Sequence, residues 1–580
     1  MNRFDRSGTL VNRKFYHFLI PTVLSTIAIS LNEFVDSIIV SNMLGSDAMS
    51  LVNMGYPVML TFAVVYTLLG VGGSVVYAEL TGKQEVKRAG MSFSAVILAS
   101  LVIAVIISVL GIVFLEPISA GICRDKGLLV QFVPYMRVLV ISGILIIPLQ
   151  VLITFLPALG SPGVGTAINI TANAVNLIMD YIYIRYFNTG LKGAAMATFT
   201  GYAAGLLLAL VLALLKKVEI PFGRFGISEY KNLPDTILRG AAPALNQFGY
   251  CIKIAFCNNL AMSLAGIAGV SVFTLCMQTV SIMSIFIAGI IGAMVPIMAA
   301  LNGQGDYKGV RILMKTALIM QFAVNLMLVA ILEFFPGSIL FIYNVKGDLV
   351  APSIHALRIF SVMFIFRGFV MVFMYYFQVI SRKAYAVIIG MIDGFAGIIP
   401  LALILSSFMG ITGIWIAFPL LSVILLAGIL IANYVISLRS DGRLKGILLY
   451  EYEEESIPAY DATVLLNEND IVKNAKALQD FCEEKLTDPG LSSLVAVTSE
   501  EMGIYTMDRK DKSLLDEIDL LVKIYEDNVT MDIRSVGKPF DITSSPAEEY
   551  SNIDVIRKIA LSIDYAYVTG MNQTRIKIKR

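Results

Sequence analysis

The stretch from residue 18 to residue 45, FLIPTVLSTIAISLNEFVDSIIVSNMLG, decides the fold of this chain. It is largely apolar and carries two acids, Glu33 and Asp36, and no base. A helix needs roughly 20 apolar residues to cross about 30 Å of hydrocarbon. A charge at the bilayer centre costs on the order of 2.5–3.5 kcal/mol, so a retained charge usually has a partner or a function. The stretch therefore predicts a membrane-spanning helix with a functional carboxylate.

Eleven further apolar stretches follow along the chain. Strand-like alternation with regular turns is absent, and only helices and closed barrels satisfy every backbone group in lipid. We therefore predict an all-α polytopic membrane protein. Its twelve transmembrane helices are expected at about residues 14–40, 50–76, 90–115, 130–157, 164–187, 193–215, 236–262, 268–300, 312–335, 354–380, 384–408 and 412–437.

The composition supports this class and divides the chain into two parts. Of the 580 residues, 57% are hydrophobic and 15% are charged, whereas soluble chains have about 45–50% and 25%. Residues 1–445 carry 29 Lys and Arg against 17 Asp and Glu, and residues 446–580 carry 15 against 26. An ordinary soluble protein is excluded. A nucleic-acid partner is not expected either, because the positive charge is scattered along loops.

Cysteines and histidines indicate no resident cofactor. The five cysteines form no CxxC pair, and His17 and His355 stand far apart, so we expect neither a disulfide framework nor a bound metal centre. The basic start MNRFDRSGTLVNRK lacks a small-residue cleavage site, so we expect no removable signal peptide.

Loop charges predict the orientation. With the N-terminus inside, inner segments hold 19 Lys and Arg and outer segments hold five. The positive-inside rule then places both termini in the cytoplasm of a multi-pass protein of the cell membrane. The acidic C-terminal part, at residues 460–580, is expected to be a small cytoplasmic α+β domain.

The chain repeats at a shift of about 220 residues. Pro21 recurs as Pro243, and the Gly190-x2-Gly193 pattern recurs 220 residues later. Each half holds six predicted spans, so the halves share one orientation and form two parallel six-helix bundles, at 1–215 and 236–440, joined by a cytoplasmic linker at 216–235. Such repeats place a substrate cavity between two bundles that rock against each other, which favours a carrier over a channel.

Polar residues inside the spans form the candidate site. Asn173, Asn176 and Asp180 lie at i, i+3 and i+7 on one helical stripe. A buried carboxylate with neighbouring amides can hold a proton or a hard cation such as Na⁺. The alternative is that Asp36 is interfacial and Asp180 pairs with Arg185. Asp393 is a candidate for a second polar cluster.

The opening stretch resembles the multidrug and toxic compound extrusion (MATE) family through Pro21, Val35-Asp36, Leu44-Gly45 and Pro57. NAVNLIMDYIYI resembles that family's fifth-span Asn-x3-Asp motif. The resemblance covers about residues 14–437 and implies an exporter driven by H⁺ or Na⁺ antiport. It implies a coupling site at Asp36, Tyr135, Asn176, Asp180 and Thr198, with Na⁺ held by Asp36, Asn176 and Asp180.

The C-terminal part resembles the GHKL ATPase fold of anti-sigma-factor kinases through SEEMGIY, IRSVGKPFD and YAYVTGMNQTRIKIK. Three nucleotide elements depart from that pattern. Tyr505 stands where the Mg²⁺-binding Asn belongs, Ser535 stands where an adenine-binding Asp belongs, and SSPAEEYSNIDVIRK lacks the lid glycines. We expect no ATP cofactor, and a sensing, docking or structural role stays open, with a protein partner for this domain.

Three functions remain. The first, which we favour, is a secondary active exporter, not an enzyme, whose Phe- and Met-rich cleft binds small lipophilic or cationic compounds. The second is a flippase for lipid-linked precursors, with a cleft made basic by Arg137, Lys253, Arg358 and Arg367. The third is a membrane-tethered sensor that acts through the C-terminal domain.

Overall fold

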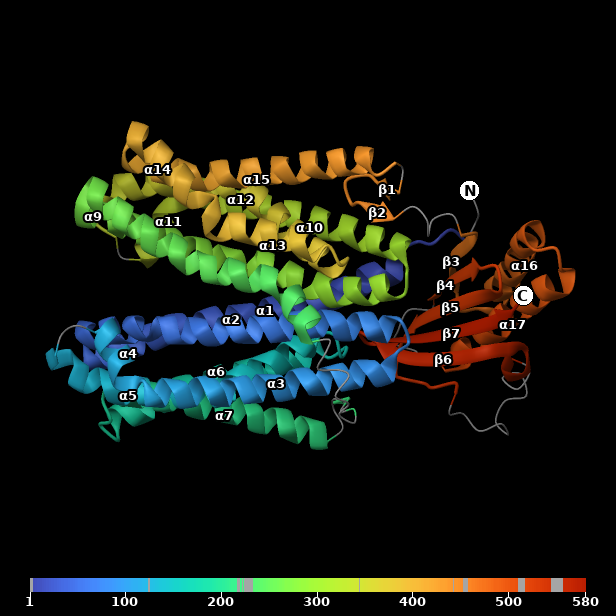
Figure 1. Cartoon of the computed structure of the whole chain (residues 1–580), viewed down its shortest axis with the longest axis horizontal. Coiled ribbons are helices and arrows are strands. Elements are labelled where there is room, and N and C mark those ends of the chain that lie inside the picture. The colour runs from blue at the N-terminus through green and yellow to red at the C-terminus, as the bar shows by residue number, and fades with distance from the viewer. Residues whose placement is uncertain are drawn as a thin grey trace.

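The computed structural model shows long helices side by side and a β-sheet at one end of them (Figure 1). It describes residues 4–123, 126–215, 220–221, 223, 233–343, 345–441, 443–451, 457–509, 517–543 and 556–580. Most of the expected linker at 216–235 lies outside these residues, as does the stretch 544–555 that contains most of the expected lid segment.

Two groups of helices make up the membrane part. The first holds α1 Thr9–Leu44, α2 Ser46–Gly82, α3 Val86–Val113, α4 Leu115–Ile122, α5 Lys126–Phe155, α6 Pro162–Arg185 and α7 Leu191–Leu214. The second holds α9 Leu233–Gly303, α10 Tyr307–Phe334, α11 Pro336–Ile342, η1 Gly347–Leu349, α12 Val350–Val379, α13 Lys383–Met391, the π-helical turn η2 Ile392–Ala396, α14 Ile398–Met409 and α15 Ile411–Arg439. We call them the first and the second bundle.

Among the described residues, ten helical segments are long and apolar enough to cross a membrane. One of them, α9, contains a sharp break at Gly266, whose φ is 62° and ψ is −152°. Glycine adopts this backbone conformation without the steric cost that a Cβ would add. The break lies between two predicted spans, 236–262 and 268–300. Helix α6 is not among the ten, and it carries the polar stripe.

The two bundles pack closely through α2 and α9. A Cβ on Gly72 would lie 2.0 Å from the carbonyl oxygen of Thr236, and a Cβ on Gly303 would lie 2.1 Å from that of Glu79. No side chain fits at such distances, so glycine permits backbone contact here. The carboxylate of Glu79 in the first bundle also forms an ion pair with Arg239 in the second. Near these residues the bundles are closed against each other.

The C-terminal β region is a five-stranded antiparallel sheet of order β3-β4-β5-β7-β6. Alternate residues such as Leu520, Val522 and Met531 face α16 and α17 and form an apolar core. A short hairpin, β1 and β2, precedes the sheet. The elements are β1 Leu444–Lys445, β2 Tyr450–Glu451, β3 Ala459–Leu465, α16 Glu468–Lys485, α17 Pro489–Asp508, β4 Glu517–Ile524, β5 Asn528–Val536, β6 Ala560–Val568 and β7 Met571–Lys579.

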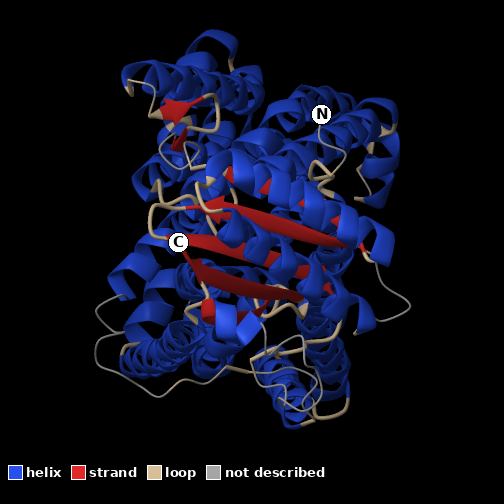
Figure 2. Ribbon diagram, turned by 90° about the vertical axis from the view of Figure 1, so that its right-hand side faces the viewer, coloured by secondary structure: helices blue, strands red, loops and turns tan. Residues whose placement is uncertain are grey.

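The sheet lies against the ends of both bundles, with its polar face toward them (Figure 2). We call this end of the membrane part the docked end. Lys14 of α1 donates a hydrogen bond from Nζ to the carbonyl oxygen of Gly570 at 3.0 Å. Lys523 of β4 donates a hydrogen bond to the carbonyl oxygen of Gly305, in the second bundle, at 2.8 Å. The side chain of Gln304 donates to that of Gln573 at 2.8 Å. One sheet therefore contacts both halves of the transmembrane part.

Candidate functional site

Helices α1 and α6 meet through a ladder of polar pairs. Asn169 donates to the hydroxyl of Ser25 at 2.8 Å, and Asn32 donates to the amide oxygen of Asn176 at 3.1 Å. Further along, the carboxyl groups of Asp36 and Asp180 lie within hydrogen-bonding reach of each other. The two members of every pair are 144 positions apart, so the helices run parallel in one register.

At the acid pair, Asp180 is shielded from solvent and Asp36 is half-buried. The Asp180 side chain is fully buried, and no N–H or O–H group within the described residues donates to either of its carboxylate oxygens. Two carboxyl groups can hydrogen-bond only if one of them carries a proton. Arg185 is exposed and forms no described ion pair with Asp180, so the alternative pairing of these two residues is wrong. The geometry can hold a shared proton.

Tyr135 and Thr198 lie around the acid pair in different ways. The Tyr135 ring is 5% exposed and packs against Gly55, where a Cβ would lie 2.8 Å from the ring carbon Cε1. It is close enough to interact electrostatically with both carboxyl groups. Thr198 lies one turn from Gly201, which packs against Asn176, but its hydroxyl donates to its own helix at Ala194. The structure thus brings Asp36, Tyr135 and Asp180 together with Asn176 one turn away, whereas the described contact of the Thr198 hydroxyl lies within its own helix.

A cavity of about 490 Å³ lies between the bundles, lined from α1, α2, α5, α6, α9 and α12. Ser25 and Asn169, the first pair of the ladder, line it. Asp36 is eleven residues beyond Ser25 on α1, or about 16 Å along the helix axis at 1.5 Å per residue. The ladder therefore connects the cavity with the acid pair.

The expectation of a Phe- and Met-rich cleft is wrong. The described residues that line the cavity include one aromatic ring, Tyr375, and one methionine, Met371. The many phenylalanines of the second bundle, such as Phe360 and Phe364, are packed in its core instead. Hydroxyl and amide side chains from both bundles form most of the polar lining.

The second bundle has its own polar cluster around Asp393, as its sequence position suggested. Asn246 donates to the Asp393 carboxylate at 2.8 Å, and Arg367 pairs with it at 3.5 Å. Lys253 donates to the main-chain oxygen of Asp393 at 3.0 Å. Asp393 lies in the π-helical turn η2. Arg367 and Asn246 line the cavity, whereas Arg137 and Arg358 are exposed on other surfaces.

Comparison with known proteins agrees with this architecture. The MatE family model matches residues 21–182 and 244–404, more than half of the chain and both bundles. The chain belongs to the MATE transporter family. The multidrug export protein MepA of Staphylococcus haemolyticus (strain JCSC1435) is 21% identical over 413 residues, covering 71% of this chain and 90% of that protein. MepA of Staphylococcus aureus (strain MSSA476) is 22% identical over 417 residues, with the same coverage.

Among solved structures, an outward-facing multidrug resistance MATE transporter of the MOP superfamily has a similar fold. It superposes with a TM-score of 0.69 at 22% identity, covering 75% of this chain and 99% of that one. Members of the MATE family are transporters and not enzymes. As a MATE protein, this chain is therefore a multi-pass membrane transporter of small molecules.

Sequence reasoning missed three members of the ladder in this MATE chain: Ser25, Asn32 and Asn169. Asn32 is one turn before Asp36, and Asn169 is four residues before Asn173, so both continue polar stripes that the spacing already marks. The polar residues of α1 and α6 recur with the same spacing, so that each pair is separated by 144 positions. Only knowledge that α1 and α6 are neighbours reveals it.

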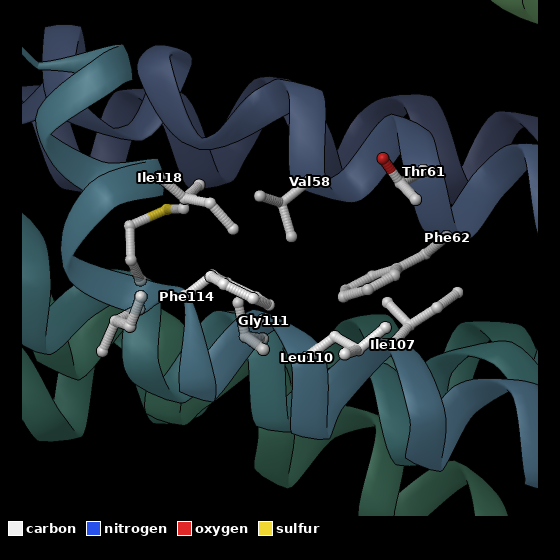
Figure 3. Close-up of a pocket in the computed structure, with 11 residues that line it drawn as sticks. Val58, Thr61, Phe62, Ile107, Leu110, Gly111, Phe114 and Ile118 are labelled. Atoms are coloured by element: carbon white, nitrogen blue, oxygen red, sulfur yellow. The ribbon is translucent and has the colours of Figure 1, made fainter.

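Two further pockets lack the features of a coupling site. The first, of about 260 Å³ between α2, α3, α4 and α5, has an almost entirely apolar lining (Figure 3). The hydroxyl of Thr61 in its wall donates to the carbonyl oxygen of Pro57 and so is already used. The second, of about 490 Å³ at the docked end, is lined by Glu79, Lys83 and Arg382 among others. Glu79 there is paired with both Lys83 and Arg239.

Residues in the C-terminal part that depart from the nucleotide-binding pattern are packed against neighbours. Tyr505 is 3% exposed, its ring meets Phe540 edge-on with centroids 5.8 Å apart, and the Arg509 guanidinium lies 3.9 Å from the ring centroid. Ser535 is also buried, in β5 opposite Asn572. These side chains are part of the domain's own packing.

Proposed function

We propose that this MATE protein is a secondary active exporter that exchanges a small molecule for H⁺ or Na⁺ by alternating access. The observation that carries the proposal is the Asp36–Asp180 pair, in which Asp180 is fully buried and which the α1–α6 ladder joins to a cavity between two bundles. The multidrug export proteins that the chain resembles support a multidrug substrate range. Twelve spans follow if α9 counts as two, broken at Gly266, and the polar α6 is added to the remaining nine segments.

Coupling follows from the electrostatics of the acid pair. With one proton the two carboxyl groups attract through a hydrogen bond, and without it two like charges in a low-dielectric interior repel. Gain or loss of the proton therefore changes the packing of α1 against α6. Because Ser25 on α1 and Asn169 on α6 line the cavity, that change alters the shape of the substrate site.

The same residues bear on the choice of ion. A Na⁺ ion would need oxygen ligands from both carboxylates and from Asn176. The amide oxygen of Asn176 accepts a hydrogen bond from Asn32 through one of its two lone pairs, so the other lone pair is available to a cation. The acid pair and Asn176 therefore suit either H⁺ or Na⁺ as the coupling ion.

Closure between α2 and α9 at the docked end corresponds to one of the two states that alternating access requires. We assign the docked end to the cytoplasm, in line with the excess of Lys and Arg in the inner loops. The cavity would then receive substrate from inside only after the Glu79–Arg239 ion pair and the glycine contacts between the bundles separate.

Transport in everted vesicles that contain the full chain tests the proposal. A panel of dyes is followed under an imposed ΔpH or ΔNa⁺, for wild type, Asp36→Asn, Asp180→Asn and the exposed control Glu116→Gln. We expect both aspartate variants to lose gradient-driven transport to the level of empty vesicles, while the control transports like wild type. Gradient-driven transport that survives in both aspartate variants would refute the coupling site.

A second function concerns the C-terminal domain, for which we propose that the partner is the transporter itself. Contacts of its sheet with Lys14 in the first bundle and with Gly305 in the second support this. Opening of the docked end moves these two anchors apart. The domain would therefore stabilise the state that is closed at this end.

The role of this domain is tested by comparing the full chain with a chain truncated after Arg439. We expect the truncated transporter to open more often at the docked end, measured as faster alkylation of a cysteine introduced at Asn302 in a background without the five native cysteines. Equal alkylation rates in the two chains would refute a clamping role.

A further inference from the structure

The charged side chains that line the cavity between the bundles do not suit a cation-binding site. Among the described residues that line it, one side chain is charged, Arg367, and none is a carboxylate. Asp36 and Asp180 of the first bundle lie further along their helices, Asp36 being seven residues, or about 10 Å, beyond the cavity-lining Ile29. A ligand in the cavity therefore meets a positive group first.

The surroundings of Arg367 leave this positive charge incompletely balanced. Its partner Asp393 is 3.5 Å away and also accepts a hydrogen bond from Asn246. Lys253, which is 2% exposed, adds a second ammonium beside the same aspartate. Two basic groups thus lie around one aspartate in a membrane-buried cluster: Arg367 pairs with its carboxylate, and Lys253 donates to its main-chain oxygen. Since a buried charge requires compensation, an anionic ligand group at Arg367 would complete the cluster.

The remaining lining mixes apolar side chains, such as Ile153 and Ile291, with polar ones. Gln150 of the first bundle and Gln247 of the second contribute amide groups, whereas the hydroxyls of Thr154 and Ser284 donate to main-chain oxygens of their own helices. A lipophilic cation is held best by aromatic faces and carboxylates, and the described lining offers only the ring of Tyr375. The volume of about 490 Å³ lies within the range of sites for drug-sized ligands.

We propose that the substrate of this exporter is a small organic anion whose carboxylate, sulfonate or phosphate group pairs with Arg367. The inference rests on the proposed exporter function and names its substrate class. Guanidinium binds such groups through two parallel hydrogen bonds, so charge and geometry both select for them. Amide and apolar side chains of both bundles then bind the rest of the molecule, so the affinity for substrate depends on the distance between the bundles.

An acidic group of this kind can belong to a soluble molecule or to a lipid-linked head group. The two sources share the chemistry that Arg367 recognises, and two probes separate them. Carboxyfluorescein represents a soluble organic anion, and a fluorescent short-chain phosphatidic acid represents a lipid-linked phosphate. Ethidium is the cationic comparison.

The test uses the full chain in proteoliposomes under the gradient that drives transport. Wild type, Arg367→Gln and Arg367→Lys are compared with Arg358→Gln, a matched control on the same helix whose exposed side chain pairs with Glu333 outside the cavity. We expect wild type to transport carboxyfluorescein in preference to ethidium. Arg367→Gln should raise the KM for the anion at least tenfold without reducing ethidium transport, Arg367→Lys should retain most anion transport, and the control should match wild type.

A second measurement needs no variant and so does not depend on how Arg367→Gln folds. Carboxyfluorescein should raise the Tm of the purified wild-type chain more than ethidium does at equal concentration. Preference for ethidium in both assays would overturn the inference while leaving the exporter function standing. Transport of the phosphatidic acid alone would assign the anion site to a lipid head group. If the wild-type chain moves no probe under either gradient, the exporter function itself fails.

Discussion

Arg6 and Asp306 are 300 positions apart in the chain and form a buried ion pair at the docked end, with Nη1 of Arg6 2.7 Å from both carboxylate oxygens. Arg534 of the C-terminal sheet pairs with the same aspartate. The Asp306 side chain is 1% exposed. One carboxylate in the α9–α10 loop therefore joins the N-terminal segment, the second bundle and the C-terminal domain.

Replacing Asp306 by Asn should weaken the docking of the C-terminal domain. The substitution leaves Arg6 and Arg534 buried without their shared counter-ion, and removing one partner of a buried pair costs about 3–5 kcal/mol. Hydrogen–deuterium exchange should then speed up in β4 and β5 and in residues 302–306. The matched control Asp348→Asn, at an exposed site, should exchange like wild type. Unchanged protection in Asp306→Asn would contradict the assigned role of this pair.

Docking should be insensitive to pH until strongly acidic conditions. Burial alone would raise the pKa of Asp306, but the charges of Arg534 and Arg6 outweigh it and hold the pKa well below its ordinary range. A lowered pKa contributes stability above the ordinary value of about 3.9, and that stability is lost as the pH falls further. We expect constant exchange protection from pH 8 to about pH 5 and a loss below about pH 4.

Other charged groups around Asp306 do not reverse this expectation. Asp461 faces Arg6 at 3.8 Å and Lys308 at 3.4 Å, and Asp519 faces Arg6 at 3.2 Å. Burial raises the pKa of Asp461, so its protonation on acidification favours the docked state. A loss of protection that begins near neutral pH would contradict the dominance of Asp306.

The amide pair of the ladder should behave as a coupled unit. Asn32→Leu removes the donor to Asn176 and leaves a buried amide oxygen without a partner, at a cost of about 1–3 kcal/mol. The double variant with Asn176→Leu should lose less than the sum of the two single losses. Denaturant unfolding of the purified chain measures the free energies of unfolding, and strict additivity would show that the two amides do not interact.

A larger side chain at Gly55 should disturb the coupling site through Tyr135. The Cβ of Gly55→Val would lie about 2.8 Å from the tyrosine ring, so the ring or α2 must move, at about 1–3 kcal/mol. We expect slower gradient-driven transport in vesicles at equal protein level. Gly121→Val is the matched control, because nothing lies within 4 Å of a Cβ there. Equal transport rates in Gly55→Val and Gly121→Val would show that Tyr135 takes no part in coupling.

The ion pair between the bundles should stabilise closure at the docked end. Arg239→Gln removes the positive partner that Glu79 finds across the α2–α9 contact. Spin labels at the exposed positions Lys87 and Lys315, one on each bundle, should then show a larger long-distance population. Arg88→Gln serves as the control because its partner Glu85 lies in the same bundle. An unchanged distance distribution would show that the glycine contacts alone hold this end closed.

The sequence predicted where the helices lie better than it predicted which helices pack against each other. Each of the predicted apolar stretches falls largely on helix, because a run of about 20 apolar residues identifies a span without reference to the rest of the chain. The stripe Asn173, Asn176 and Asp180 was likewise visible from helical spacing. That Asn32 and Ser25 face this stripe was not visible, because pairing between α1 and α6 joins residues 144 positions apart.

The amino-acid sequence by itself determined that this chain is a two-part, helical membrane protein with acids in its first half and a β-containing C-terminal part, because hydropathy, charge and helical period are local properties. The tertiary structure decided what those residues face. The phenylalanines of the second bundle pack in its core, Arg367 lines the cavity, and the polar face of the sheet contacts both bundles. These outcomes depend on contacts between distant segments, whose register no local pattern specifies.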